Sequence, residues 1–107
     1  MSDGLKNHHR EEIKKTLRGY KSIVHAELIG SRAMGTFTNT SDIDIALWGE
    51  LSLTDISNLQ QKIEELPIAQ KVDLINMNFV TSEAFKKHVT EYGIVWFDKT
   101  EEASSGS

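Results

Sequence analysis

The sequence is most informative between residues 30 and 49, which read GSRAMGTFTNTSDIDIALWG. An apolar, β-branched run over residues 23–29 leads into this stretch, and a second such run over residues 43–48 closes it. Both runs predict buried strands. Because only about a dozen residues separate the two strands, a parallel crossover through a full helix scarcely fits between them. We therefore predict a short helical turn and an antiparallel return, which set the start of the second strand beside the end of the first.

Helical and strand patterns alternate along the rest of the chain. The segment between the second and third strands is long enough for a whole helix, which suits a right-handed parallel crossover. The predicted helices cover residues 7–20, 54–66 (capped by Ser52 or Thr54) and 82–92 (capped by Ser82), and the later strands cover residues 72–77 and 94–97. We expect one α/β domain over residues 1–100, with a mixed β-sheet flanked by helices in the order α-β-α-β-α-β-α-β. Residues 101–107 are expected to be a disordered polar tail.

Length and composition indicate one small soluble domain. The 107 residues carry sixteen acidic and twelve basic side chains, a net charge of −4, which argues against a surface built mainly to bind nucleic acid. No apolar stretch approaches the ~20 residues of a membrane span, and no signal-peptide pattern begins the chain. The chain has no cysteine, which excludes disulfides and thiolate metal sites and suits a reducing cytoplasm. We therefore expect a cytoplasmic protein without membrane attachment or direct nucleic-acid contact.

Three aspartates are predicted to gather at one edge of the sheet. Asp42 and Asp44 open the second strand, two residues apart and therefore on the same face, and Asp73 lies near the start of the third strand. Carboxylates brought together in this way repel one another unless a cation neutralises them. Oxygen ligands without histidine or cysteine suit Mg²⁺ or Mn²⁺, so we predict that all three are catalytic metal ligands. Taken alone, the first two would be interpreted as solvated carboxylates at an exposed strand start.

The Gly30-Ser31 pair predicts an anion site at the same edge. If Ser31 opens a helical turn, its hydroxyl and the free backbone N–H groups face outward, and Gly30 lets a phosphate approach the backbone closely. A phosphate-binding turn opposite a carboxylate cluster is what a nucleoside triphosphate with Mg²⁺ requires. Gly30, Ser31 and Arg32 are therefore the predicted nucleotide-binding residues. For Arg32, a contact with a partner protein and a plain surface cation are the alternatives.

The spacing of these elements resembles the minimal nucleotidyltransferase family of the DNA polymerase β superfamily. The shared pattern is Gly-Ser, about ten residues, Asp-x-Asp, and one further Asp on a later strand; here these are Gly30-Ser31, Asp42-x-Asp44 and Asp73. The resemblance covers most of the chain and implies the nucleotidyltransferase fold. It implies that the Gly-Ser turn binds the triphosphate and that the first two aspartates bind metal. The third aspartate would complete the site and help to activate the acceptor hydroxyl.

The resemblance also implies an activity and partners. The activity is metal-dependent transfer of a nucleoside monophosphate, AMP from ATP, to an acceptor hydroxyl, with release of pyrophosphate. Relatives of this length often act with a small all-helical HEPN-type protein, as the antitoxin of a toxin–antitoxin pair in which a tyrosine of the toxin is the acceptor. Two alternatives stay open: the catalytic subunit of a two-subunit enzyme that modifies a small molecule, and a non-catalytic antitoxin or binding module. A homo-oligomer stays open as well.

Most other aromatic and polar residues are expected to be structural. The four histidines show no metal-ligand spacing, so we expect them to be structural or exposed. The two tryptophans and Phe97 lack interleaved basic residues and are interpreted as core or interface aromatics. Phe85, Val89 and Tyr92 are expected to form the buried face of the last helix.

Overall fold

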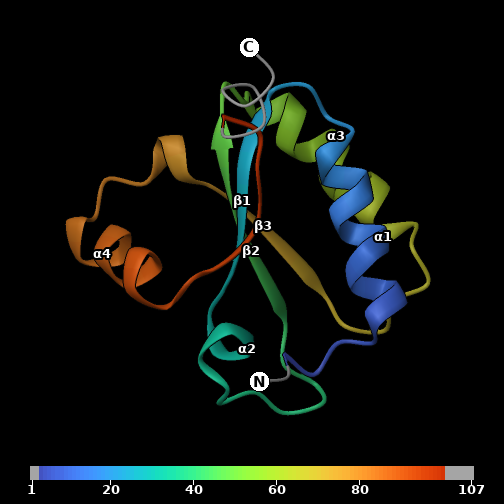
Figure 1. Ribbon diagram of the computed structural model, residues 1–107. Helices are drawn as coiled ribbons and strands as arrows, with labels where there is room; N and C mark the ends of the chain where they lie inside the picture. The colour runs from blue at the N-terminus through green and yellow to red at the C-terminus, as the bar shows by residue number, and fades with distance from the viewer. Residues whose placement is uncertain (1–2, 101–107) are drawn as a thin grey trace.

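The computed structural model of the protein describes residues 3–100, and the predicted disordered tail over residues 101–107 lies outside the described residues. All predicted helices and strands are present within this range (Figure 1). In chain order the elements are α1 (Asn7–Arg18), β1 (Ile23–Ile29), α2 (Ser31–Met34), β2 (Ile43–Gly49), α3 (Leu53–Glu64), β3 (Val72–Asn76), the 3₁₀ helix η1 (Met77–Phe79), α4 (Glu83–Tyr92) and β4 (Ile94–Asp98). The sequence patterns predict each of these elements except η1.

The strands form one four-stranded sheet in the order β3-β2-β1-β4. β2 pairs antiparallel with β1 and parallel with β3, which confirms both the predicted short return after β1 and the predicted crossover through α3. β4 pairs antiparallel with β1, so the sheet is mixed, as predicted. The register places Ile29 opposite Asp44, and Asp44 opposite Asp73. The end of β1 and the starts of β2 and β3 therefore meet at one edge of the sheet.

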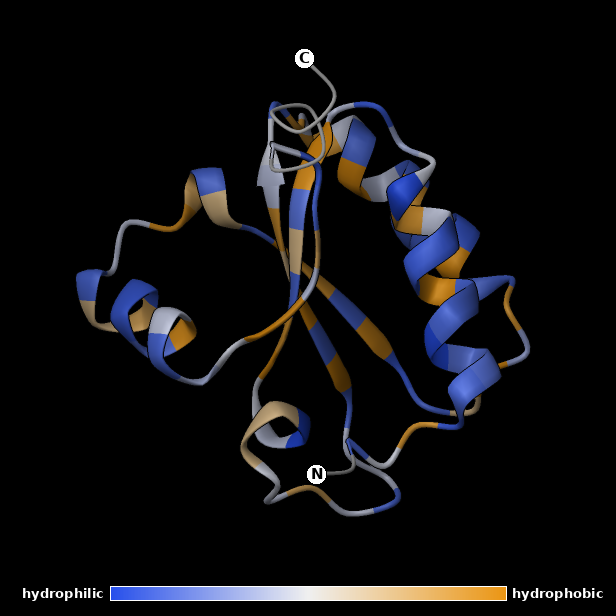
Figure 2. Cartoon of the chain, in the orientation of Figure 1, coloured by the Kyte–Doolittle hydropathy of each residue, from blue (hydrophilic) through white to orange (hydrophobic). Residues whose placement is uncertain are grey.

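Helices cover both faces of this sheet, with α1 and α3 on one face and α4 on the other (Figure 1). Against α1 and α3 the sheet buries a large apolar cluster that includes the fully buried Ile13, Leu17 and Leu59. A smaller cluster under α4 includes Ala46 and Val89. Figure 2 shows hydrophobic bands that recur along the helices and strands between hydrophilic ones, as expected for elements with one buried face. Within residues 3–100, no helix has the length and apolar character needed to cross a membrane.

The starts of α3 and α4 follow from their capping residues. Ser52 accepts a hydrogen bond from the backbone N–H of Asp55, whose carboxylate accepts one in return from the N–H of Ser52. Ser82 caps α4 by accepting a hydrogen bond from the N–H of Phe85. The expectation that Tyr92 is buried is wrong: its side chain is 48% exposed, because the short α4 buries little more than one turn against the sheet.

Candidate functional site

Three aspartates lie at the edge where β1 ends and β2 and β3 begin. Asp44 of β2 and Asp73 of β3 are paired in register on adjacent parallel strands, so both side chains project from the same face of the sheet. Both are half-buried, whereas Asp42, two residues before Asp44, is exposed in the loop that leads into β2. The Nζ atom of Lys71 lies 3.5 Å from Oδ1 of Asp73. Strand pairing therefore brings the predicted acidic residues to one place.

The surroundings of Asp44 disfavour the ionised form of its carboxyl group. Burial raises the pKa of its carboxyl above the ordinary value, and the neighbouring carboxylates of Asp73 and Asp42 raise the pKa further. The positive charge of Lys71 acts in the opposite direction with a smaller effect. An ionised Asp44 is therefore repelled by its neighbours, and a cation bound beside it would relieve that repulsion.

The donor chemistry of the three aspartates fits a hard divalent cation. Oxygen ligands without histidine or cysteine suit Mg²⁺ or Mn²⁺, which keep water and phosphate oxygens in their remaining positions. Across residues 3–100, however, no three histidine or acidic side chains close around a common point tightly enough to hold an ion as they stand. A cation held by all three aspartates would therefore require the side chains of Asp42, Asp44 and Asp73 to draw together.

Gly30 joins β1 to α2 at the same edge, in a backbone conformation that favours glycine. Its φ is +76° and its ψ is −155°. A Cβ atom at this position would lie 2.6 Å from Oδ2 of Asp44, so the carboxylate occupies the space that a side chain would need. Ser31 follows directly and begins α2. The Gly-Ser turn and the Asp44 carboxylate are therefore immediate neighbours.

A pocket of about 520 Å³ opens between this edge of the sheet and α4. Its lining residues are Ile29, Gly30, Asp44, Asp73, Leu74, Ile75, Phe85 and His88. The volume falls in the range of small-ligand sites, ~300–1,000 Å³. Ser31 directly follows the lining residue Gly30, and Asp42 lies two residues before the lining residue Asp44, but neither lines the pocket itself. The pocket therefore has one wall of carboxylates and glycine backbone and another wall of apolar and aromatic side chains.

Arg32 is the predicted site residue that the structure places elsewhere. Its side chain is 1% exposed and does not line the pocket. The guanidinium donates hydrogen bonds to the backbone carbonyl oxygens of Asp3, Thr38 and Ser41. The alternative of a surface cation is therefore wrong, and the structure places the guanidinium away from the pocket beside Asp44. Arg32 instead ties the amino-terminal segment to the loop that leads into Asp42.

The sequence patterns miss two of the pocket residues, Phe85 and His88. Phe85 contributes both to the apolar cluster under α4 and to the pocket lining. His88, expected to be structural or exposed, is half-buried and faces the same pocket. Their i, i+3 spacing is a signal available in the sequence. Only the packing of α4 shows that this helical face is turned toward Asp44 and Asp73.

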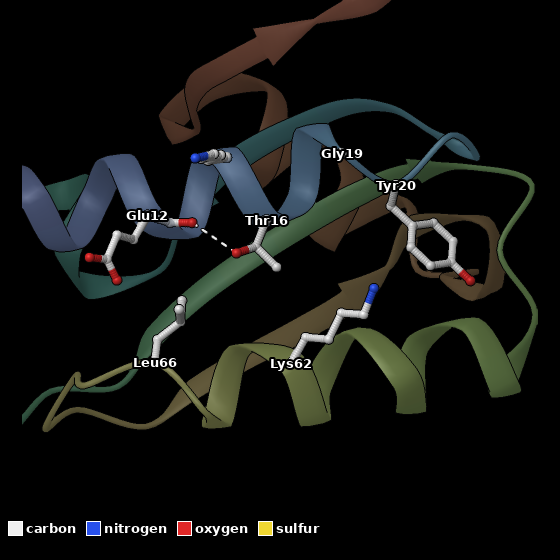
Figure 3. Close-up of a pocket in the computed structure, with 7 residues that line it drawn as sticks. Glu12, Thr16, Gly19, Tyr20, Lys62 and Leu66 are labelled. Atoms are coloured by element: carbon white, nitrogen blue, oxygen red, sulfur yellow. Dashed lines mark hydrogen bonds between the residues drawn. The ribbon is translucent and has the colours of Figure 1, made fainter.

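A second hollow of comparable volume, about 530 Å³, lies on the opposite face of the sheet, between α1 and α3. It is lined by Glu12, Lys15, Thr16, Gly19, Tyr20, Lys62 and Leu66 (Figure 3). Figure 3 shows Lys62 extending toward Tyr20, while the Thr16 hydroxyl donates a hydrogen bond of 2.9 Å to the carbonyl of Glu12 within α1. Its lining includes neither a carboxylate pair nor the Gly-Ser turn. The candidate site is therefore the pocket beside Asp44.

Solved structures resemble this chain over most of its length. A chain in a toxin–antitoxin complex with AMP-PNP is 26% identical, with a TM-score of 0.71, over 87% of this chain and 76% of that chain. A chain in a complex of a tri-AMPylated Shewanella oneidensis HEPN toxin with an MNT antitoxin is 21% identical, with a TM-score of 0.68. The match covers 94% of this chain and 78% of that chain. A chain in a toxin–antitoxin MntA-HepT complex is 22% identical, with a TM-score of 0.66. The match covers 91% of this chain and 76% of that chain. The last two matches show a likeness of fold alone.

A family model matches most of the chain. Residues 11–102 match the family described as "Polymerase beta, Nucleotidyltransferase", whereas no curated protein matches the chain significantly. The matched range includes every strand of the sheet, the Gly-Ser turn and all three aspartates. The chain therefore belongs to the polymerase beta nucleotidyltransferase family.

Proposed function

We propose that this chain is a metal-dependent nucleotidyltransferase that moves AMP from ATP to a hydroxyl group of a HEPN-type partner protein. The observation that carries the proposal is the position of the Asp44 carboxylate, which fills the space that a Cβ atom of Gly30 would need, in a pocket that Asp73 also lines. This arrangement brings a phosphate-binding turn within reach of acidic residues, as nucleotidyl transfer requires. Family membership supports the reaction class, and the AMP-PNP in a similar toxin–antitoxin complex supports an adenine nucleotide.

The Gly-Ser turn is proposed to bind the triphosphate. The missing side chain at Gly30 leaves room for the Asp44 carboxylate beside the turn, and the Ser31 hydroxyl at the start of α2 can donate a hydrogen bond to a phosphate oxygen. Asp42, Asp44 and Asp73 would hold Mg²⁺ or Mn²⁺, which when bound offsets phosphate charge and polarises the α-phosphate. Burial, together with repulsion from the carboxylates of Asp73 and Asp42, raises the pKa of Asp44, and a cation at this edge would offset that repulsion.

The proposed reaction exchanges one bond to phosphorus for another. The acceptor hydroxyl oxygen bonds to the α-phosphorus of ATP, and the bond from that phosphorus to the oxygen that bridges to the β-phosphate breaks. Pyrophosphate leaves with the electron pair of the broken bond. The half-buried Asp73 carboxylate is proposed to accept the hydroxyl proton, since it lines the pocket and remains partly accessible to solvent.

A partner protein is proposed to supply the acceptor hydroxyl. Similar structures are antitoxins bound to HEPN toxins, and one of those toxins is tri-AMPylated. We place the reaction in the cytoplasm, which suits a chain without cysteine.

The proposal is tested by incubating the chain with ATP, Mg²⁺ and a HEPN-type protein from the same organism, and measuring the intact mass of that partner. We expect the mass of the partner to rise by one or more AMP units, and EDTA to prevent the increase. An unchanged partner mass, with both proteins folded and ATP present, would refute transfer to this partner.

Replacing Gly30 with alanine is expected to lower AMP transfer by about 10-fold or more and to destabilise the fold by about 1–2 kcal/mol. The new methyl group would strain a backbone at φ +76° and displace the Asp44 carboxylate. Transfer and Tm are the measurements. Gly19→Ala is the matched control, since φ at Gly19 is −72° and the nearest atom to an added Cβ is the Lys15 carbonyl oxygen at 3.4 Å. Equal effects of the two substitutions would count against a special role for Gly30.

A further inference from the structure

Two residues of α4 form a wall of the pocket that the proposed chemistry does not use. Phe85 and His88 lie one helical turn apart, so their side chains share one face of α4. Both are half-buried, and both line the pocket that also holds Asp44 and Asp73. Phe85 is anchored by its packing in the apolar cluster under α4. The α4 wall, as we call Phe85 and His88, is therefore held firmly opposite the acidic edge.

The imidazole of His88 is available to a ligand. Its ring contacts Tyr92, with 4.9 Å between ring centroids and 46° between the planes. In the part of the chain that the structure describes, His88 makes no hydrogen bond or ion pair with another residue. A half-buried imidazole whose two nitrogen atoms lack protein partners can offer one donor and one acceptor to a bound molecule.

The pocket lining has an acidic part and an apolar part, which match the phosphate chain with its cation and the nucleoside of a nucleoside triphosphate. At the sheet edge, Gly30, Asp44 and Asp73 suit an anionic phosphate chain with its cation. The rest of the lining is apolar or aromatic and includes Leu74, Ile75 and the α4 wall. A nucleobase is flat and presents an apolar face together with polar edges. Stacking of a base on an aromatic ring contributes ~1–3 kcal/mol, so the α4 wall has the chemistry to hold the nucleoside end of the substrate.

We infer that the α4 wall is the nucleoside-binding part of the site: the Phe85 ring packs against the base, and an imidazole nitrogen of His88 hydrogen-bonds the base edge or the ribose. This inference rests on the proposed function and deepens it, since it names the residues that distinguish a nucleotide from a bare polyphosphate. Because an aromatic ring stacks with any base, Phe85 contributes affinity for nucleosides in general, with larger purines held more tightly than pyrimidines.

The inference is tested by calorimetric titration of the chain with ATP and, separately, with inorganic tripolyphosphate, both with Mg²⁺. We expect wild type to bind ATP more tightly than tripolyphosphate. Phe85→Leu, which keeps an apolar side chain in the cluster, and His88→Ala are each expected to weaken ATP binding by about 10-fold and to leave tripolyphosphate binding unchanged. Lys87→Ala is the matched control, because Lys87 is an exposed neighbour on α4 that does not line the pocket.

The outcomes separate this inference from the proposed function. Equal wild-type affinities for ATP and tripolyphosphate, or ATP affinities in both variants equal to wild type, would overturn the nucleoside role of the α4 wall and leave AMP transfer standing. A folded wild-type chain that binds neither compound would overturn both. An unchanged circular-dichroism spectrum of His88→Ala is expected, since the described contact of this ring is with the half-exposed Tyr92.

Discussion

Replacing Asp44 with asparagine is expected to lower AMP transfer by roughly 100-fold or more while raising the Tm of the metal-free protein. The loss of activity follows from the removal of a proposed metal ligand at the centre of the acidic cluster. The gain in stability follows from the removal of a half-buried carboxylate that Asp73 and Asp42 repel. Transfer to the partner and Tm in EDTA are the two measurements.

The pH dependence of stability checks the cause of this gain. Because folding raises the pKa of Asp44, its ionised form destabilises the metal-free protein at neutral pH. This destabilisation is complete above the raised pKa and disappears as the pH falls to the ordinary value near 3.8. The Tm difference between Asp44→Asn and wild type should therefore shrink on acidification. Glu50→Gln, which removes an exposed carboxylate just after β2, should change neither activity nor Tm. A fully active Asp44→Asn, or one less stable than wild type at neutral pH, would contradict the account.

The Arg32→Ala substitution is expected to lower the free energy of unfolding by about 3 kcal/mol or more. The guanidinium is 1% exposed and donates to the carbonyls of Asp3 at 3.0 Å and Ser41 at 3.0 Å, with a longer bond of 3.4 Å to Thr38. It also lies 5.2 Å from the ring centroid of Phe37. Its removal would take the guanidinium donor away from the buried carbonyl oxygen of Asp3 and the partly buried one of Ser41. Urea unfolding measures the loss.

Two further variants distinguish the shape of this side chain from its charge. Arg32→Lys keeps the charge but lacks the planar fork that serves several carbonyls at once, so it is expected to recover only a minor part of the lost stability. Lys21→Ala, at an exposed turn residue, is expected to unfold at the wild-type urea concentration. If Arg32→Ala also unfolds at the wild-type urea concentration, the guanidinium does not hold the amino-terminal segment and the loop before Asp42 together.

Local signals explain why most of the fold is predictable. β1 ends as predicted because its apolar run stops at Gly30, and α3 begins at its Ser52 cap. The short connection after β1 leaves an antiparallel return as the easier route, and this return is observed. The 3₁₀ helix η1 escapes prediction because it is only three residues long and is capped by a local side-chain contact, in which Oδ1 of Asn76 accepts a hydrogen bond from the backbone N–H of Asn78.

The positions of the site residues can be predicted from the sequence only where strand pairing fixes them. Asp44 and Asp73 are brought side by side by the parallel register of β2 and β3, which follows from the crossover. Arg32 differs, because its burial depends on carbonyl groups from two segments, the amino-terminal segment and the loop before Asp42, that meet at this side chain only in the folded chain. Phe85 and His88 differ for a related reason: their helical spacing is visible, but the direction that α4 faces is a matter of tertiary packing.

The central claim is that the α-phosphate of ATP is transferred to a partner protein, and two positions of a radioactive label test it most directly. The chain is incubated with Mg²⁺ and the HEPN-type partner, in parallel with ATP labelled at the α-phosphate and ATP labelled at the γ-phosphate. We predict that the α-label appears on the partner and the γ-label in released pyrophosphate. A γ-label on the partner, or a partner that carries neither label, would show that the chain does not perform this transfer.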